Sequence, residues 1–314
     1  MLVNGRDCLI VIKTAYREVG IPYAEETIRE AVSLLTEEAP IEGDGYCRAI
    51  RKSGGVTGCV VTPLTIGTAP LLFYLAMGSA GLPLYVSETR NLYLYRLNLL
   101  PMEDSTRFDL VQDRGGSRKL YEGCAVTAFE LRINRGEAGQ QASIKLKLDI
   151  QGERPAVVYP YQDMAPTETG ERFMGDRVSY RINGTEYLNI YGLTVSTKKE
   201  SGKKTELWIK RILEPGTDLP DLIEELTVTA QLYREKYEYR YYGMFRLTFT
   251  RLVLTADETA VDTGGTVIGP LRYYVAGTVN AEVFTTNDGV LTHLKHKNPL
   301  ARGRSMAGRK NEVL

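Results

Sequence analysis

Alternating apolar and polar positions predict that most of this chain forms β-strands. In the segment SIKLKLDI (143–150), every second residue is aliphatic and polar residues occupy the positions between. The segment AFELRI (128–133) repeats this alternation, which is typical of a strand with one buried face. A connection with two glycines, 133–143, joins the two segments, so residues 118–151 are expected to form a β-hairpin.

One segment, 68–80, has the pattern of a buried helix. Thr68 is placed as its N-cap, Pro70 lies in the first turn, and Gly78 or Gly81 is a stop signal. The segment is apolar nearly all round, so we expect other elements to cover it on every side.

A second helix is expected at about 217–232. Thr217 or Asp218 is placed as its cap, and Pro220 lies in the first turn. Its apolar residues fall on one face; they are Leu219, Leu222, Ile223 and Leu226. The second half, LTVTAQLY, is strand-like, which leaves the end of this helix open.

A new β-hairpin is predicted to begin in the middle of the chain, at 177–199. Every second residue of VSYRI (178–182) is apolar, and Asn183-Gly184 follows. This dipeptide is strongly preferred in type I′ turns because both residues tolerate a positive φ. We therefore expect residues 187–195 to return beside the first strand.

These patterns divide the chain into two β-rich domains, 1–152 and 177–290. The segment between them, 153–176, is rich in proline and has little periodicity, so it is predicted to be a linker. The C-terminal segment 291–314 is basic, contains glycine and lacks an apolar period, which indicates an extended arm.

The order of elements recurs in the two halves, which favours a tandem duplication. Each half is expected to contain strands, then one helix, then further strands. The segments YEGCAVTAFELRI (121–133) and YYGMFRLTFTRLV (241–253) also share a Tyr, a Gly and a Phe at one offset.

Composition narrows the possible functions. The 314 residues include 39 Lys and Arg and 39 Asp and Glu, so the net charge is zero. This net charge does not favour binding to nucleic acid or to an anionic membrane. No apolar run reaches the roughly 18 residues that span a bilayer, and the N-terminus is a poor signal peptide. The four cysteines lack CxxC spacing, which indicates a reduced protein made in the cytoplasm.

No motif in the chain predicts catalysis. P-loop, G-x-S-x-G and HExxH motifs are absent. His293 and His296 have no acidic or cysteine ligands at suitable spacing, so no metal site is expected. RGGSRK (114–119) could hold a phosphate, but a hairpin turn is the better interpretation because no helix follows it. We expect neither enzymatic activity nor a cofactor.

Lysines flank a predicted hairpin tip at 198–204. They are Lys198, Lys199, Lys203 and Lys204. They either make the loop soluble or contact a neighbouring subunit. The tyrosines at 233–242 alternate with basic residues and are expected in a core or an interface; a surface for single-stranded nucleic acid is the alternative.

The second half of the chain resembles the tail tube proteins of long-tailed bacteriophages and related contractile injection machines. The likeness lies in the hairpin VSYRINGTEYLNIYGLTVSTKK, the strand KKTELWIKRI, the helix expected at 217–232, and the long strands YYGMFRLTFTRLVLTADE and GPLRYYVAGTVNAEVF. The first-half segment LYEGCAVTAFELRINRGEAGQQASIKLKLDI resembles the same closing hairpin. The resemblance covers about 30–152 and 177–284.

The resemblance implies a mainly β protein with two tandem tail-tube-like β-sandwich or barrel domains, each with one helix. In that family, strands of neighbouring domains join into an inner barrel, six domains make a ring, and stacked rings form a channel for DNA. With two copies per chain, three chains would complete a ring. Six chains, each with one domain on the outside, is the alternative.

The implied partners are further copies of this chain, other tail proteins (tape measure, baseplate or distal tail, terminator) and DNA in transit, with no membrane. The implied location is the virion tail, after synthesis in the host cytoplasm. Two alternatives stay open: another ring-forming tail or baseplate protein such as a hub, distal-tail or terminator protein, and a non-viral β-sandwich module that binds carbohydrate or a receptor.

Overall fold

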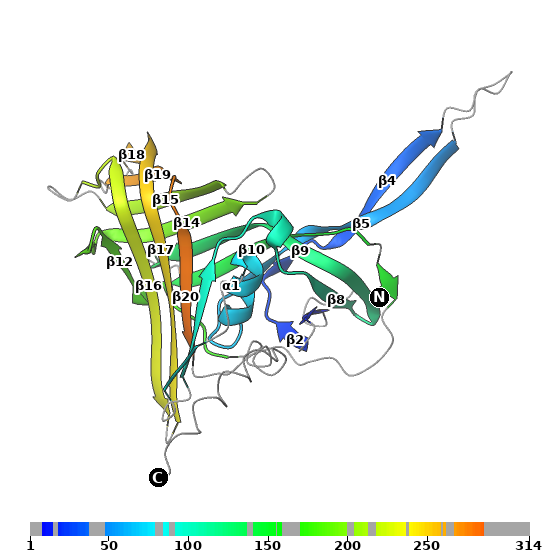
Figure 1. Ribbon diagram of the computed structural model, residues 1–314, viewed down its shortest axis with the longest axis horizontal. Helices are drawn as coiled ribbons and strands as arrows, with labels where there is room; N and C mark the ends of the chain where they lie inside the picture. Colours follow the sequence, from blue (N-terminus) through cyan, green and yellow to red (C-terminus); the bar gives the residue numbers. More distant parts are fainter. Residues whose placement is uncertain are drawn as a thin grey trace, which may run out of the picture.

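The computed structural model shows a mainly β protein with three layers of strands around one helix (Figure 1). It describes residues 8–14, 18–37, 48–78, 84–87, 92–136, 141–154, 156–158, 170–199, 204–212, 218–236, 239–258, 260–261 and 267–285; at several strand ends only the backbone is described. The expected mainly β fold is confirmed.

The first layer is an antiparallel sheet in the order β12–β16–β17–β20–β7–β6. Its strands are β12 (Val178–Ile182), β16 (Leu222–Lys236), β17 (Tyr239–Asp257), β20 (Val279–Thr285), β7 (Leu92–Asn98) and β6 (Leu84–Ser87). The short β13 (Thr185–Glu186) lies against the end of β12.

The second layer crosses the first and has the order β19–β15–β14–β9–β10–β5 (Figure 1). Its strands are β19 (Val267–Val275), β15 (Lys204–Ile212), β14 (Ile190–Lys198), β9 (Ser117–Asn134), β10 (Ser143–Gly152) and β5 (Arg48–Pro63). β3 (Glu25–Glu26) and β4 (Arg29–Glu37) pair with β5, and β18 (Ala260–Val261) pairs with β19.

The third layer is built on the first part of β9. It contains β2 (Glu18–Ile21), β1 (Cys8–Lys13), β8 (Phe108–Arg114) and β11 (Val157–Val158). Two 3-10 turns, η2 (Met102–Asp104) and η3 (Gly175–Arg177), complete the elements of the described residues.

β17 connects the first two layers. Its residues 243–249 pair with β20 in the first layer, whereas its residues 252–257 pair with β19 in the second. Arg251 lies at the transition and has a positive φ of 53°, a conformation that non-glycine residues rarely adopt. The two layers therefore separate at this point of one long strand.

The helix α1 (Ala69–Met77) is confirmed as a buried element, and Gly78 follows its last residue. It contacts β7, β9 and β20. Phe73 packs against Phe245 of β17 at 5.3 Å between ring centroids, and Phe173 packs on the same ring at 5.2 Å. Thr68 is the N-cap residue, as expected, but its hydroxyl makes no capping hydrogen bond to the helix and bonds instead with the hydroxyl of Thr65 at 2.9 Å.

The prediction of a second helix at 217–232 is wrong. Residues 222–236 form strand β16, which pairs with β17 along its length. From residue 226 onward, apolar side chains at every second position are at most 5% exposed, namely Leu226, Val228, Ala230 and Leu232. This period of two and the long pairing with β17 outweigh the helical spacing of the leucines before it. The second half therefore contains no helix in its described residues.

The turn at Asn183-Gly184 is confirmed, with φ values of 49° and 82°. The prediction that residues 187–195 pair with β12 is wrong. Only β13 returns along β12, and β14 pairs with β15 and with β9 instead. A two-residue return strand leaves the chain free to cross into the second layer.

Strands from the two predicted domains pair directly. β14 pairs with β9, and β20 pairs with β7. The predicted linker 153–176 contributes β11 and the buried Phe173. One core cluster contains residues from both sides of this segment. The tandem duplication stays a prediction, and the predicted arm 291–314 lies outside the described residues.

Within the described residues, no helix combines the length and the apolar character needed to cross a bilayer.

Candidate functional site

Part of the outer side of the first layer carries a patch of polar side chains, which we call the polar face; the next row on this side is apolar and consists of Met244, Phe284 and Leu94. Strand alternation creates the polar face, because the residues between the polar ones point into the core. On β17, for example, Phe245, Leu247 and Phe249 are buried, whereas Arg246 and Thr248 between them are partly exposed.

The strand register arranges the polar face in two rows across five strands. The first row is Arg181, Thr227, Thr248, Asn280 and Asn98, and the second row is Ser179, Thr229, Arg246, Glu282 and Arg96. The face is hollowed, with a volume of about 690 Å³ that these side chains line together with Glu225 and Gln231. The layer is therefore concave on its polar side.

The charges of the polar face nearly cancel. Glu282 pairs with Arg246 at 3.2 Å and with Arg96 at 3.3 Å. Arg181 adds a third cation and Glu225 a second carboxylate, so three positive and two negative charges line the hollow. Glu225 accepts a hydrogen bond from the hydroxyl of Thr227 at 3.2 Å.

The two edges of the first layer differ in their covering within the described residues. β6 pairs with β7 only as far as Leu94, and no described strand pairs with the outer edge at residues 95–98. At the other edge, β13 covers the end of β12, and the carbonyl groups of Val178 and Tyr180 accept hydrogen bonds from the Arg135 side chain at 2.7 Å and from the N–H of Tyr187 at 2.9 Å. The outer edge of β7 therefore presents main-chain groups that a further strand could pair with.

The four lysines expected at one hairpin tip do not form one exposed cluster. Lys198 and Lys204 are exposed and lie opposite each other at the end of the β14–β15 hairpin. Lys199 is only 2% exposed, and its Nζ bonds to the Oγ of Ser105 at 3.2 Å. Lys203 lies outside the described residues. An expected contact through Lys199 is therefore not available on the surface of this chain.

Burial changes the chemistry of Lys199. Because an apolar environment disfavours the ammonium form, its pKa falls from 10.5 to about 8. The sequence contained a signal for this position. Leu193, Val195 and Thr197 are buried at every second residue of β14, and Lys199 continues the same side.

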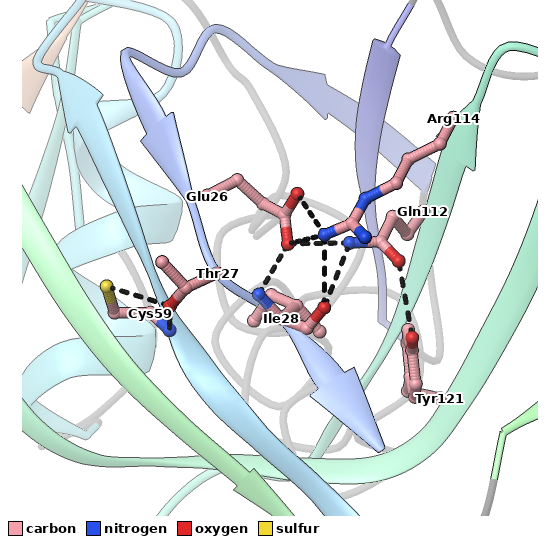
Figure 2. A network of polar contacts seen from close by, with 7 residues as sticks. All are labelled: Glu26, Thr27, Ile28, Cys59, Gln112, Arg114 and Tyr121. Carbon is pink, nitrogen blue, oxygen red and sulfur yellow. Dashed lines mark hydrogen bonds and ion pairs between the residues drawn. The ribbon is translucent and has the colours of Figure 1, made fainter. Parts of the chain in front are cut away.

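A network of polar contacts around Glu26 joins the third layer to β3 (Figure 2). The Nη2 of Arg114 lies 2.9 and 2.8 Å from the two carboxylate oxygens, and Gln112 donates to Oε1 at 2.6 Å. The backbone N–H of Ile28 donates to the same oxygen, and Tyr121 donates to the amide oxygen of Gln112 at 3.2 Å. Each of these contacts holds a neighbouring element, so the network is structural.

The predicted turn in RGGSRK is confirmed. Gly115 and Gly116 connect β8 to β9 with φ values of 62° and 93°. The N–H of Gly116 donates to Asp113, and Arg118 pairs with the same carboxylate at 2.6 Å. The N–H of Gly116 and the guanidinium of Arg118 are therefore already bound by a carboxylate of the chain.

The remaining candidates carry no site in the described residues. His293 and His296 lie outside them, as do the side chains of the tyrosines at 233–242. Cys59 and Cys124 are free thiols, and burial raises the pKa of Cys124 to about 12, which makes it unreactive. Within the described residues, no group of His, Cys, Asp and Glu could hold a metal ion.

Sequence reasoning missed the polar face. The alternation in RLTFT of β17 indicates a strand with a polar side, but the sequence does not reveal that Arg96 and Glu282, 186 positions apart, lie side by side. In comparisons with known proteins, neither a family model nor a curated protein matches the chain.

Proposed function

We propose that this chain is a structural subunit that assembles into stacked rings of a phage tail tube, through which DNA passes. The polar face is the observation that carries this proposal. A tube wall needs a curved sheet whose concave side meets water and a passing polyanion, with a core behind it. The first layer has this construction, since its concave side is polar and its other side packs on the core that includes α1.

The edges of the first layer support the same assembly. In the described residues no strand pairs with the outer edge of β7 beyond Leu94, whereas the edge of β12 is held by β13 and by Arg135, which a second copy would have to displace. Pairing of one edge with the opposite edge of a second copy would extend the sheet around a ring.

A projecting hairpin supplies a candidate arm between rings. β4 and β5 extend from the body (Figure 1), and the nine residues of β4 span roughly 30 Å. Lys198 and Lys204 remain candidate contacts to a neighbouring subunit, because both are exposed at the end of one hairpin.

Electron microscopy of the full-length chain over a range of concentrations tests the proposal. We expect rings with a central channel that stack into tubes, and the mass of one ring will distinguish three chains from six. A protein that stays monomeric at high concentration, and forms no ring in a virion preparation either, would contradict it. Copy number separates a tube subunit from a hub, distal-tail or terminator protein, which would be present as one ring.

The hollow on the polar face favours one second candidate, a module that binds carbohydrate. Arg, Asn, Thr and Glu side chains converge on it, and such groups can orient hydroxyl groups of a sugar. A glycan array that gives tight one-to-one binding, for a protein that forms no polymer, would favour this candidate over the tube.

A further inference from the structure

Glu282 lies between two arginines of the polar face and contacts both. Its Oε1 is 3.3 Å from the Nε of Arg96, and its Oε2 is 3.2 Å from the Nη1 of Arg246. The register places Arg246, Glu282 and Arg96 side by side on β17, β20 and β7. Because adjacent strands are about 4.8 Å apart, the two arginines stand on strands about 10 Å apart, and one carboxylate serves both.

The two arginines have the properties of a phosphate-binding pair. Their side chains are 63% and 42% exposed, whereas that of Glu282 is 28% exposed. They line a concave surface, where a ligand can contact several strands at once. Guanidinium groups form strong, charge-assisted hydrogen bonds to phosphate oxygens.

The attached carboxylate has an advantage over a phosphate from solution. Since Glu282 is part of the chain, it occupies the arginines without the loss of translational freedom that a free ligand incurs. Binding of DNA is driven largely by the counterions released when cations neutralise phosphates. Arginines whose charge a shared carboxylate partly offsets contribute less to that release.

We propose that Glu282 is an internal counter-ion that prevents Arg96 and Arg246 from binding the phosphate backbone of duplex DNA. Its removal is expected to expose a phosphate-binding pair on the polar face. Weak DNA binding matters only if the chain forms a channel, so this part rests on the proposed function. A channel wall that binds phosphate groups would slow the passage of DNA.

The test is a comparison of DNA affinities for dilute full-length protein. The affinity for a short fluorescent duplex is measured by fluorescence anisotropy for the wild type, Glu282→Gln and Glu225→Gln. The second substitution is the matched control. It removes the same charge from the same face, but Glu225 bonds to Thr227 and both salt bridges of Glu282 stay intact.

We expect Glu282→Gln to bind the duplex at least about tenfold more tightly than the wild type, with a steeper salt dependence between about 50 and 200 mM salt. Glu225→Gln should change the affinity much less. Adding Arg96→Gln and Arg246→Gln to Glu282→Gln should abolish the gain. Circular dichroism and the melting temperature verify that each variant is folded.

Two outcomes would overturn the inference: an equal gain in both single variants, which indicates a simple effect of net charge, or no gain in a folded Glu282→Gln protein. The same experiments distinguish a failure of the proposed function from a failure of this inference. A chain that forms no rings but gains DNA binding in Glu282→Gln contradicts the tube alone, whereas rings without this gain contradict the counter-ion alone.

Discussion

The ammonium group of Lys199 lies 3.2 Å from the hydroxyl of Ser105, in a position where the side chain is only 2% exposed. The backbone N–H of Lys199 also donates to the carbonyl of Thr127 at 2.9 Å. The lysine thereby connects the end of β14 to the segment after η2 and to β9. This connection requires a cation to be buried, which is unfavourable while the amine is protonated.

Stability should therefore rise with pH through the titration of Lys199. The folded protein releases this proton at about pH 8, compared with 10.5 for an unperturbed lysine. Between these values the unfolded chain binds more protons than the folded one, so the free energy of unfolding increases with pH. The increase from pH 7 to pH 9.5 should be about 2 kcal/mol.

Urea unfolding of the wild type and of Lys199→Met at several pH values measures this effect. The variant should lack the increase, whereas Lys198→Met, at the exposed neighbour, should keep it. The effect of Lys199 is taken as the difference between the two profiles, because burial also raises the pKa of Cys124 to about 12 and its ionisation in the unfolded chain lowers stability from about pH 9. Measurements should stay below pH 10, since burial raises the pKa values of Tyr180 and Tyr273 as well. Parallel pH profiles of the wild type and Lys199→Met would contradict the prediction.

Phe245 should be one of the most important residues for stability, because it joins three parts of the chain. Phe73 of α1 and Phe173 of the predicted linker both pack on its ring, and it is fully buried. Phe245→Ala should reduce the free energy of unfolding by about 3–5 kcal/mol. Phe284→Ala is the control, since Phe284 lies in the same layer but is partly exposed.

Denaturant unfolding of both variants decides this prediction. The loss in Phe284→Ala should be clearly smaller than the loss in Phe245→Ala. Similar losses would mean that the contact between α1 and the first layer adds little to the core.

The sequence correctly predicted those elements whose conformation is determined by residues close together in the chain. Asn183-Gly184 specifies its turn through backbone preference, and the alternation in 143–150 specifies a strand. The helix expected at 217–232 was wrong because the spacing of Leu219, Leu222 and Leu226 suits a helix, while pairing with β17 decides the conformation. That pairing is a tertiary effect that no local pattern contains.

The candidate site was less predictable than the fold. The polar face depends on pairing between β7 and β20, which lie far apart in the sequence. Sequence reasoning placed Lys199 in an exposed loop because it treated the four lysines as one group. Every second residue of β14 faces the core, and Lys199 continues this buried side, whereas Lys198 is exposed. Composition alone does not distinguish the two lysines.

The Glu26 network should contribute more stability than a similar ion pair nearby. The carboxylate of Glu26 is 7% exposed and accepts hydrogen bonds from Arg114, Gln112 and Ile28. Glu26→Ala removes the acceptor of the Ile28 N–H and leaves Gln112 and Arg114 only their longer bonds to the carbonyl of Ile28, so it should cost about 2–4 kcal/mol. Glu30→Ala should cost about 1 kcal/mol or less, because Glu30 pairs with a partly exposed Lys119.

Thermal unfolding of Glu26→Ala and Glu30→Ala provides the measurement, and Glu26→Gln adds a refinement. Glutamine retains one acceptor oxygen but no negative charge for Arg114, so its loss should be intermediate. If Glu26→Ala and Glu30→Ala are equally stable, the network around Glu26 (Figure 2) is not a significant connection between the layers.

Gly175 is required by close contact rather than by a turn conformation. A Cβ atom at this position would lie 1.9 Å from the carbonyl oxygen of Asn134, which belongs to the backbone and cannot rotate away. Gly175→Ala must therefore displace η3 from the end of β9. We expect a loss of about 3 kcal/mol or more in the free energy of unfolding.

Gly184→Ala is the informative comparison for this substitution. No atom lies within 4 Å of a Cβ built there, so only its φ of 82° opposes a side chain. A left-handed conformation costs a non-glycine residue about 1–2 kcal/mol. Equilibrium unfolding should rank Gly175→Ala as the more damaging change. The opposite ranking would mean that η3 can move away from Asn134 at little cost, and that the segment before β12 is not held against the second layer.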